Sequence, residues 1–205
     1  MLSIELENIS KWFGERRVFE NINLKLESPS SLAIIGPNGS GKSTLLKIIC
    51  GLIRPTQGKV RIKVDGQEIK PEDQPAFFSL VAADVELYEE LTALENLKFF
   101  TGLRDFKSST TEMNQKLEAV GLKDRGQEPI GAFSSGMKQR LKYAVALSSY
   151  PKILILDEPS SNLDEEGVFL MEKIIEEQKK VGMVILATND LKETQYARKT
   201  YKLVN

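Results

Sequence analysis

The segment GPNGSGKST carries the clearest chemistry in the sequence. It fits the pattern G-x-x-x-x-G-K-[S/T], in which glycines allow backbone N–H groups to turn toward phosphate oxygens. The lysine adds a positive charge, and the hydroxyl that follows it can ligate Mg²⁺. The apolar runs LAII and LLKIICGL flank the segment, so a bound phosphate would also lie at a helix N-terminus. We therefore expect a nucleotide phosphate site formed by Gly36, Pro37, Asn38, Gly39, Ser40, Gly41, Lys42, Ser43 and Thr44.

Two adjacent carboxylates follow a second apolar run, in the segment ILILDEPSSNLD. Asp157 is suited to hold the Mg²⁺ bound with a nucleotide. Glu158, one residue further, is suited to polarise an attacking water as a general base. By itself the pattern also fits a solvated strand end, so its interpretation depends on the phosphate site.

A third apolar run ends in polar residues, VILATND, with Asn189 just beyond the strand. In an open α/β sheet, such a strand end faces the ligand crevice. An asparagine amide donates hydrogen bonds to phosphate oxygens but carries no charge. Alternatively, Asn189 is the N-cap of the segment DLKETQYAR. The chain contains no histidine, which excludes histidine acid–base chemistry and histidine metal sites.

The surrounding patterns indicate the elements that position these residues. Residues 3–9 and 18–26 alternate as half-buried antiparallel strands do, whereas SLAIIG, KILILD and MVILAT are the continuous apolar runs of a parallel sheet. Between the runs SLAIIG and KILILD, Thr92 and Glu95 have the spacing of a capping box that opens a helix. We expect further helices over 111–120 and 136–149. The predicted fold is an α/β P-loop NTPase core with a mostly parallel sheet, an N-terminal antiparallel β subdomain and an inserted α-helical subdomain. We expect one domain over 1–205, with the core in 1–83 and 151–205 and the helices in 84–150.

Composition narrows the class of protein. The chain of 205 residues has 28 basic and 29 acidic residues and a net charge of −1, which argues against a nucleic-acid partner. Its single cysteine, Cys50, excludes an internal disulfide framework. No apolar run approaches the roughly 20 residues that span a bilayer, and the N-terminus does not resemble a signal peptide. We expect a cytoplasmic protein.

A fourth motif gives a family resemblance. FSSGMKQRL, within 133–141, resembles the L-S-G-G-Q signature of ATP-binding-cassette (ABC) proteins, with Ser134 and Gly136 matching. The resemblance covers essentially the whole chain, and the motifs occur in family order. It implies that ATP is held between two cassettes in a head-to-tail dimer, either a homodimer or a heterodimer, with the segment SNLD, ending in Asp164, crossing the interface. It also implies that Phe13 stacks on adenine, although Phe13 or Trp12 could equally belong to the hairpin core.

Two positions depart from the family pattern. Ala83 stands where the family has a glutamine that ligates Mg²⁺, and Asn189 stands where it has a histidine that contacts the γ-phosphate. Asp84, beside Ala83, is a possible substitute ligand. Because Lys42, Ser43, Asp157 and Glu158 remain, we expect slow ATP hydrolysis rather than none.

The resemblance implies an ATPase subunit that powers a membrane transporter by ATP-driven dimer closure, attached to the inner face of the membrane through a separate integral subunit. The segment VELYEELTALENLKFF suits a docking groove for a partner helix, and equally an amphipathic core helix. The compact length is similar to that of the small ATPase of the cytochrome-c-maturation haem exporter. The alternative is an ABC-type assembly switch that binds ATP with little turnover, which Ala83 and Asn189 favour.

Overall fold

The computed structural model describes residues 1–104 and 108–203 of the chain. The strands are β1 (Leu2–Phe13), β2 (Arg16–Glu27), β3 (Ser30–Ile35), β4 (Gln57–Val64), β5 (Gln67–Glu68), β6 (Phe78–Val81), β7 (Ile153–Asp157), β8 (Met183–Thr188) and β9 (Lys199–Lys202). The α-helices are α1 (Lys42–Ile49), α2 (Ala93–Gly102), α3 (Thr110–Ala119), α4 (Ser135–Leu147) and α5 (Glu165–Val181). Short 3₁₀ helices are η1 (Gln74–Phe77), η2 (Ile130–Ala132) and η3 (Leu191–Tyr196).

The first strands form an antiparallel sheet in the order β2-β1-β4-β5. Its buried residues alternate along β1, with Ile4 and Leu6 inside and Ser3 and Glu5 more exposed. This alternation is the reason that the predicted strands at the N-terminus form half-buried antiparallel pairs. The prediction of strands there is confirmed, and both strands extend beyond the predicted ranges.

The second sheet is parallel, in the order β6-β7-β8-β3-β9. Its central strands are buried on both faces, which explains their continuous apolar sequences. Alternate residues belong to two different cores: Leu32 and Ile34 pack with α1 and the antiparallel sheet, whereas Leu154 and Leu156 pack with the helices of the other face. The predicted mixed α/β fold is confirmed.

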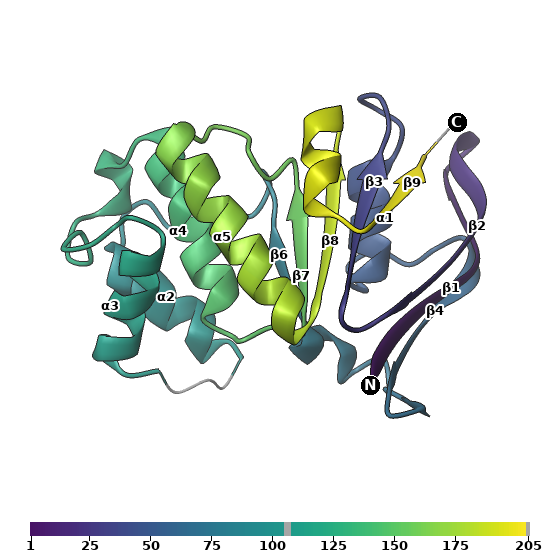
Figure 1. Cartoon of the computed structure of the whole chain (residues 1–205), viewed down its shortest axis with the longest axis horizontal. Helices are drawn as coiled ribbons and strands as arrows, with labels where there is room; N and C mark the ends of the chain where they lie inside the picture. The colour runs from purple at the N-terminus through teal and green to yellow at the C-terminus, as the bar shows by residue number, and fades with distance from the viewer. Residues whose placement is uncertain (105–107, 204–205) are drawn as a thin grey trace.

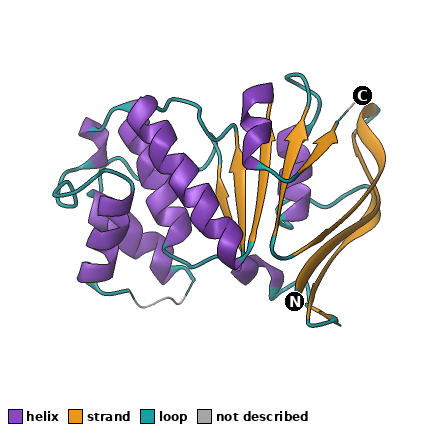
Figure 2. Ribbon diagram, viewed as in Figure 1, coloured by secondary structure: helices purple, strands orange, loops and turns teal. Residues whose placement is uncertain are grey.

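Helices α2, α3 and α4 gather at one end of the molecule, and the antiparallel sheet lies at the other end, with the parallel sheet between them (Figures 1 and 2). The capping box predicted at Thr92 and Glu95 is present at the start of α2. A second capping box, from Ser109 and Glu112, opens α3. The range predicted for the helical subdomain, 84–150, contains these helices and also residues 105–107, which lie outside the described residues.

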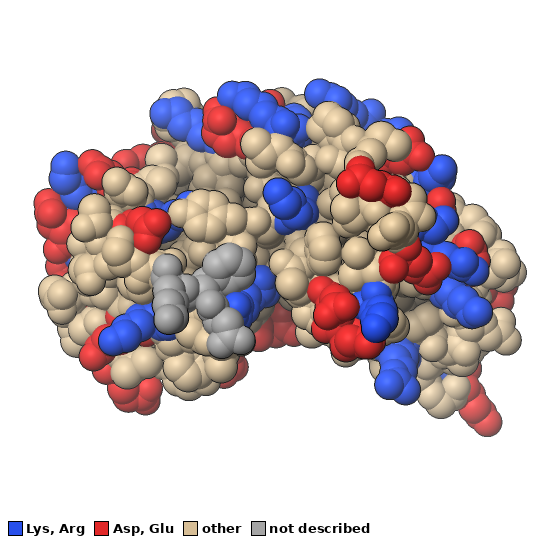
Figure 3. All heavy atoms as spheres, turned by 90° about the horizontal axis from the view of Figure 1, so that it is seen from below, with Lys and Arg blue, Asp and Glu red and all other residues tan. Residues whose placement is uncertain are grey.

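Strands β7, β8 and β3 are neighbours in the parallel sheet, so their carboxyl ends meet at one edge (Figure 1). The predicted site residue Asp157 ends β7, and the segments that follow β8 and β3 contain Asn189 and Lys42. On the face drawn in Figure 3, lysine and arginine side chains are interspersed with aspartate and glutamate rather than gathered in one basic stripe.

Candidate functional site

The glycine-rich loop connects β3 to α1, as predicted, and its backbone needs glycine at defined points. Gly41 is the N-cap of α1 with φ of 97°, and no side chain caps the helix. A Cβ at Gly41 would lie 2.5 Å from Val18 Cγ1, and one at Gly36 would lie 2.8 Å from the Leu203 carbonyl oxygen. The first N–H groups of α1 are therefore left for an anion rather than for a capping side chain.

Lys42 lies beneath this loop, with only 6% of its surface exposed. Its ammonium donates to the Gly36 carbonyl oxygen at 2.9 Å and to that of Pro37 at 3.3 Å. The same nitrogen is 3.6 Å from Glu158 Oε1. The loop thus holds a cation where the glycine-rich backbone can surround a phosphate, in agreement with the chemistry of the motif.

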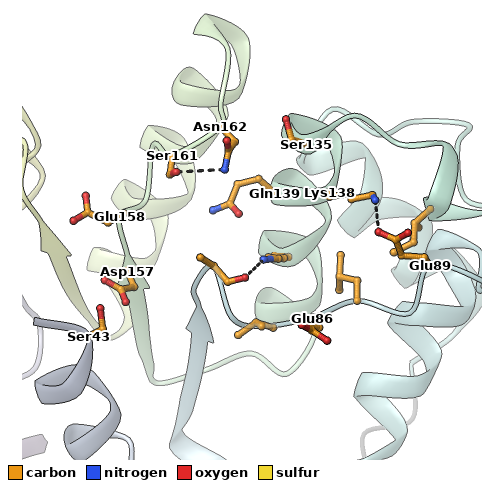
Figure 4. A pocket seen from close by; sticks show the side chains of 15 residues that line it. Ser43, Glu86, Glu89, Ser135, Lys138, Gln139, Asp157, Glu158, Ser161 and Asn162 are labelled. Atoms are coloured by element: carbon orange, nitrogen blue, oxygen red, sulfur yellow. Dashed lines mark hydrogen bonds and ion pairs between the residues drawn. The ribbon is translucent and has the colours of Figure 1, made fainter. Parts of the chain in front are cut away.

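Asp157 ends β7 beside Ser43, at the wall of an open cleft of about 670 Å³ (Figure 4). Its Oδ1 is buried and has no hydrogen-bond partner among the described residues. Burial raises the pKa of the Asp157 carboxyl, and a hydrogen bond from Ser43 opposes that rise. A buried carboxylate oxygen without a partner, next to a hydroxyl, is a donor set that fits Mg²⁺.

Glu158 follows immediately and turns into the crevice through a left-handed backbone conformation, with φ of 48°. Its N–H donates to the Ala187 carbonyl oxygen at 2.8 Å, which fixes it against β8. Oε2 lies 3.4 Å from the Asn189 backbone nitrogen and 3.5 Å from Thr188 Oγ1. The carboxylate is therefore oriented from β8 while the Lys42 ammonium lies near its other oxygen.

Asn189 lies beside the glycine-rich loop, because its Nδ2 donates to Asn38 Oδ1 at 2.9 Å. The alternative interpretation, that Asn189 caps the following helix, is wrong. Asp190 is the N-cap of η3, and its Oδ1 accepts from the Lys192 N–H at 2.8 Å. An asparagine amide that is not used as a cap remains available to a ligand of the loop.

Ala83 also lines the cleft beside Ser43 and Asp157, but a methyl group offers no ligand atom. Its carbonyl oxygen and that of Ala82 each accept from the Lys142 ammonium at 3.0 Å, which ties this loop to α4. The carboxylate of the neighbouring Asp84 forms an ion pair with Lys47. Asp84 is thus engaged with α1, and acting as a substitute metal ligand would require it to leave that pair.

Phe13 is at the tip of the β1–β2 hairpin, and 53% of its surface is exposed. The alternative that Phe13 belongs to the hairpin core is therefore wrong. The ring lines a pocket of about 620 Å³ together with Arg16, Val18 and the glycine-rich loop. The Lys11 ammonium lies 4.7 Å from the ring centroid and bonds the Arg54 carbonyl oxygen, so it helps to fix the ring.

Ser134 is the N-cap of α4, and its side chain accepts from the Met137 N–H at 3.2 Å. A Cβ at Gly136 would lie 2.9 Å from the Asn162 carbonyl oxygen, so the motif packs against the segment after Glu158. Neither Ser134 nor Gly136 is among the described residues that line the pocket of the glycine-rich loop. Ser135, between them, lines the 670 Å³ cleft that Ser43 also lines, so the signature segment borders this cleft while Ser134 and Gly136 are not among its described lining residues.

Asp164 caps α5, with its Oδ1 accepting from the Gly167 N–H at 2.9 Å. This bond gives Asp164 a structural role, and its predicted role in ATP binding stays a prediction.

Glu193 is a residue that the sequence analysis did not single out. It is 4% exposed, and its Oε1 accepts from the Ser160 N–H at 3.2 Å. Nearby, the Tyr143 hydroxyl donates to the Pro159 carbonyl oxygen at 2.8 Å. Together these bonds hold the loop that follows Glu158. A carboxylate in a short polar segment gives no sign in the sequence that it will be buried.

A profile of the ABC transporter family matches residues 19–161 of the chain. A lantibiotic transport ATP-binding protein of Streptococcus pyogenes is 36% identical over 188 residues, which cover 92% of this chain and 80% of that protein. An uncharacterized ABC transporter ATP-binding protein of Bacillus subtilis is 35% identical, with 93% and 86% covered. The solved structure of an ATP-binding subunit of an ABC transporter aligns with a TM-score of 0.84 at 29% identity, with 98% of this chain and 85% of that chain covered.

Among the described residues, no helix is both long and apolar enough to cross a membrane.

Proposed function

The chain belongs to the ABC transporter family, and from this premise we propose that it is the ATP-binding and ATP-hydrolysing subunit that powers a membrane transporter. One observation carries the proposal: Lys42, beneath a glycine-rich loop, lies 3.6 Å from the carboxylate of Glu158, and Asp157 and Ser43 lie beside them. This combination supplies the phosphate cradle, the general base and the metal ligands that phosphoryl transfer to water needs.

ATP would bind with its β- and γ-phosphates in the glycine-rich loop, where backbone N–H groups and Lys42 neutralise their charge. Phe13 would stack on the adenine, because an exposed aromatic face at the edge of the pocket suits a base. Ser43 and Asp157 would hold the Mg²⁺ that accompanies the nucleotide, and the metal would offset the charge of the phosphate oxygens. The unpaired Oδ1 of Asp157 supports this assignment.

In the hydrolytic step, a water oxygen attacks the γ-phosphorus while Glu158 accepts a proton from that water. The bond between the γ-phosphorus and the bridging oxygen breaks, and ADP leaves with that bond's electron pair. Asn189 would donate its amide hydrogen to a γ-phosphate oxygen, because it already lies within hydrogen-bond distance of the loop. Its backbone N–H near Glu158 would help to hold the base in place.

The signature residues Ser134 and Gly136 would act on the ATP of a second cassette. Their position outside the loop pocket of their own chain supports this role. The Ser134 N-cap would present its hydroxyl and the N–H groups of α4 to the partner's γ-phosphate. Asp164, at the start of α5, would lie at the same interface. ATP binding would then close a head-to-tail dimer.

The integral membrane subunit would dock beside the helical subdomain. Tyr88 and Phe99 form an edge-to-face pair with ring centroids 4.7 Å apart, and 46% and 38% of their surfaces are exposed. Phe100 joins this cluster. Exposed aromatic side chains next to the 670 Å³ cleft suit a partner helix. We propose that the chain is thereby held peripherally on the inner face of the membrane. The similarity of this chain to the ATPase of the cytochrome-c-maturation haem exporter remains a prediction.

Replacing Asn189 with histidine should raise the rate of ATP hydrolysis about tenfold, because a charged donor strengthens a hydrogen bond to phosphate by roughly 1–2 kcal/mol. Steady-state hydrolysis at saturating Mg²⁺-ATP measures this effect. Asn189→Ala should lower the rate, since it removes the amide that now contacts Asn38. Equal rates for all three proteins would show that this position does not contact the transferring phosphate.

The proposed function is tested by ATP hydrolysis over a range of protein concentrations, with Lys42→Ala as the inactive reference. We expect turnover that rises more than proportionally with concentration, because a complete site needs two cassettes. Tight ATP binding without turnover above the reference, both alone and with the membrane subunit, would instead identify an assembly switch. A chain that binds no ATP would refute both functions.

A further inference from the structure

We propose that Arg16 binds the nucleotide through the α-phosphate and the adjoining ribose, as a cationic contact outside the glycine-rich loop. The inference rests on the proposed function and adds a residue to the same site. None of the four motifs includes Arg16, which lies in the turn region of the first hairpin.

Strand geometry directs Arg16 to the nucleotide. Arg16 is the direct cross-strand partner of Phe13, so the two side chains emerge on the same face of the hairpin. Val18, two residues along β2, lies at an irregularity of the strand pairing, between Arg17 and Phe19. All three residues line the pocket of the glycine-rich loop. The neighbouring Arg17 has the opposite orientation and pairs with Glu20 at 2.9 Å.

The guanidinium of Arg16 has no hydrogen bond or ion pair within the part of the chain that the structure describes. Arg16 is exposed at the open edge of the pocket, and the lining of that pocket includes only one carboxylate, Glu158, among the described residues. An unpaired guanidinium on the wall of a phosphate pocket is a donor for phosphate oxygens, which it can contact with two parallel N–H groups.

The position along β2 selects the part of the nucleotide. Val18 lies against the loop itself, since a Cβ at Gly41 would be 2.5 Å from its Cγ1. Arg16 is about 7 Å further along the strand, at the level of Phe13. With adenine on Phe13 and the β- and γ-phosphates in the loop, the ribose and α-phosphate bridge the two. The side chain of Arg16 is long enough to reach this bridge.

This assignment predicts how binding depends on the ligand. ATP and ADP share the α-phosphate and ribose, so both should lose affinity equally when the guanidinium is removed. The affinity for GTP should fall as much as that for ATP, because the guanidinium contacts the α-phosphate and ribose and not the base. A loss confined to ATP would place the guanidinium on the γ-phosphate and overturn the assignment.

The test is a calorimetric titration of ATP, ADP and GTP into the wild-type chain, Arg16→Ala, Arg16→Lys and the matched control Arg17→Ala, each checked for folding by thermal unfolding. We expect Arg16→Ala to weaken binding of all three nucleotides about tenfold, Arg16→Lys to restore part of the loss, and Arg17→Ala to bind as the wild type does. Wild-type affinity in Arg16→Ala, or an equal loss in Arg17→Ala, would overturn the proposal. Failure of the wild-type chain to bind any nucleotide would instead refute the proposed function.

Discussion

Replacing Glu158 with glutamine should reduce ATP hydrolysis by about a hundredfold or more while ATP binding persists. A positioned general base contributes roughly 10²–10⁴ to a rate, and an amide cannot accept the proton of the attacking water. The substitution keeps the size of the side chain, and the backbone bond to Ala187 does not depend on the carboxylate. Single-turnover measurements of phosphate release, together with ATP titrations, separate the chemical step from binding.

The control for Glu158→Gln is Glu165→Gln, which makes the same chemical change in the exposed first turn of α5. We expect this variant to hydrolyse ATP at the wild-type rate. If Glu158→Gln retained most of the activity, Glu158 would not be the general base. Its left-handed backbone and its proximity to Lys42 would then have a structural role only.

Replacing Ser134 with aspartate should lower hydrolysis by about a hundredfold or more, while α4 remains intact. Aspartate is a good N-cap, so it can continue to accept from the Met137 N–H. However, its charge would face the γ-phosphate of the partner's ATP. Two like charges about 4 Å apart repel by about 4 kcal/mol at an effective dielectric constant of about 20. Hydrolysis and thermal unfolding of the same protein preparation measure both effects.

Ser134→Asn is the matched neutral variant, since asparagine also caps helices well. It should keep a substantial part of the activity that aspartate removes. If the Ser134→Asp and Ser134→Asn variants hydrolysed ATP at equal rates, no anion would approach this helix terminus. That outcome would leave α4 as an ordinary capped helix and would remove the support that Ser134 gives to a composite site.

Much of the fold could be predicted because its signals are local. The apolar runs of β3, β7 and β8 and the alternation of β1 each reflect the environment of a single strand. The capping box of α2 depends on residues three positions apart. These features need no knowledge of distant contacts, and the sequence therefore indicated two sheets of different kind and a helical insertion.

The site could be predicted where a motif contains its own chemistry and was missed where a contact depends on tertiary structure. Lys42 and Asp157 belong to short sequence motifs whose adjacent residues take part in the same site. Arg16 becomes notable only when the hairpin pairs it with Phe13 beside the loop. Glu193 becomes notable only when η3 turns it toward the Ser160 N–H. Asn189 allowed two readings, and the choice depended on Asp190 being the actual cap.

In the proposed mechanism, ATP joins two cassettes through the glycine-rich loop of one and the signature helix of the other. The most direct test is the molar mass of Glu158→Gln in solution, measured by light scattering with and without Mg²⁺-ATP. We expect the mass of a single chain, 23.0 kDa, without nucleotide and twice that mass with ATP. Adding Ser134→Asp to the same protein should prevent the doubling. A protein that binds ATP yet stays at the mass of one chain at every concentration would show that ATP does not join two copies of this cassette.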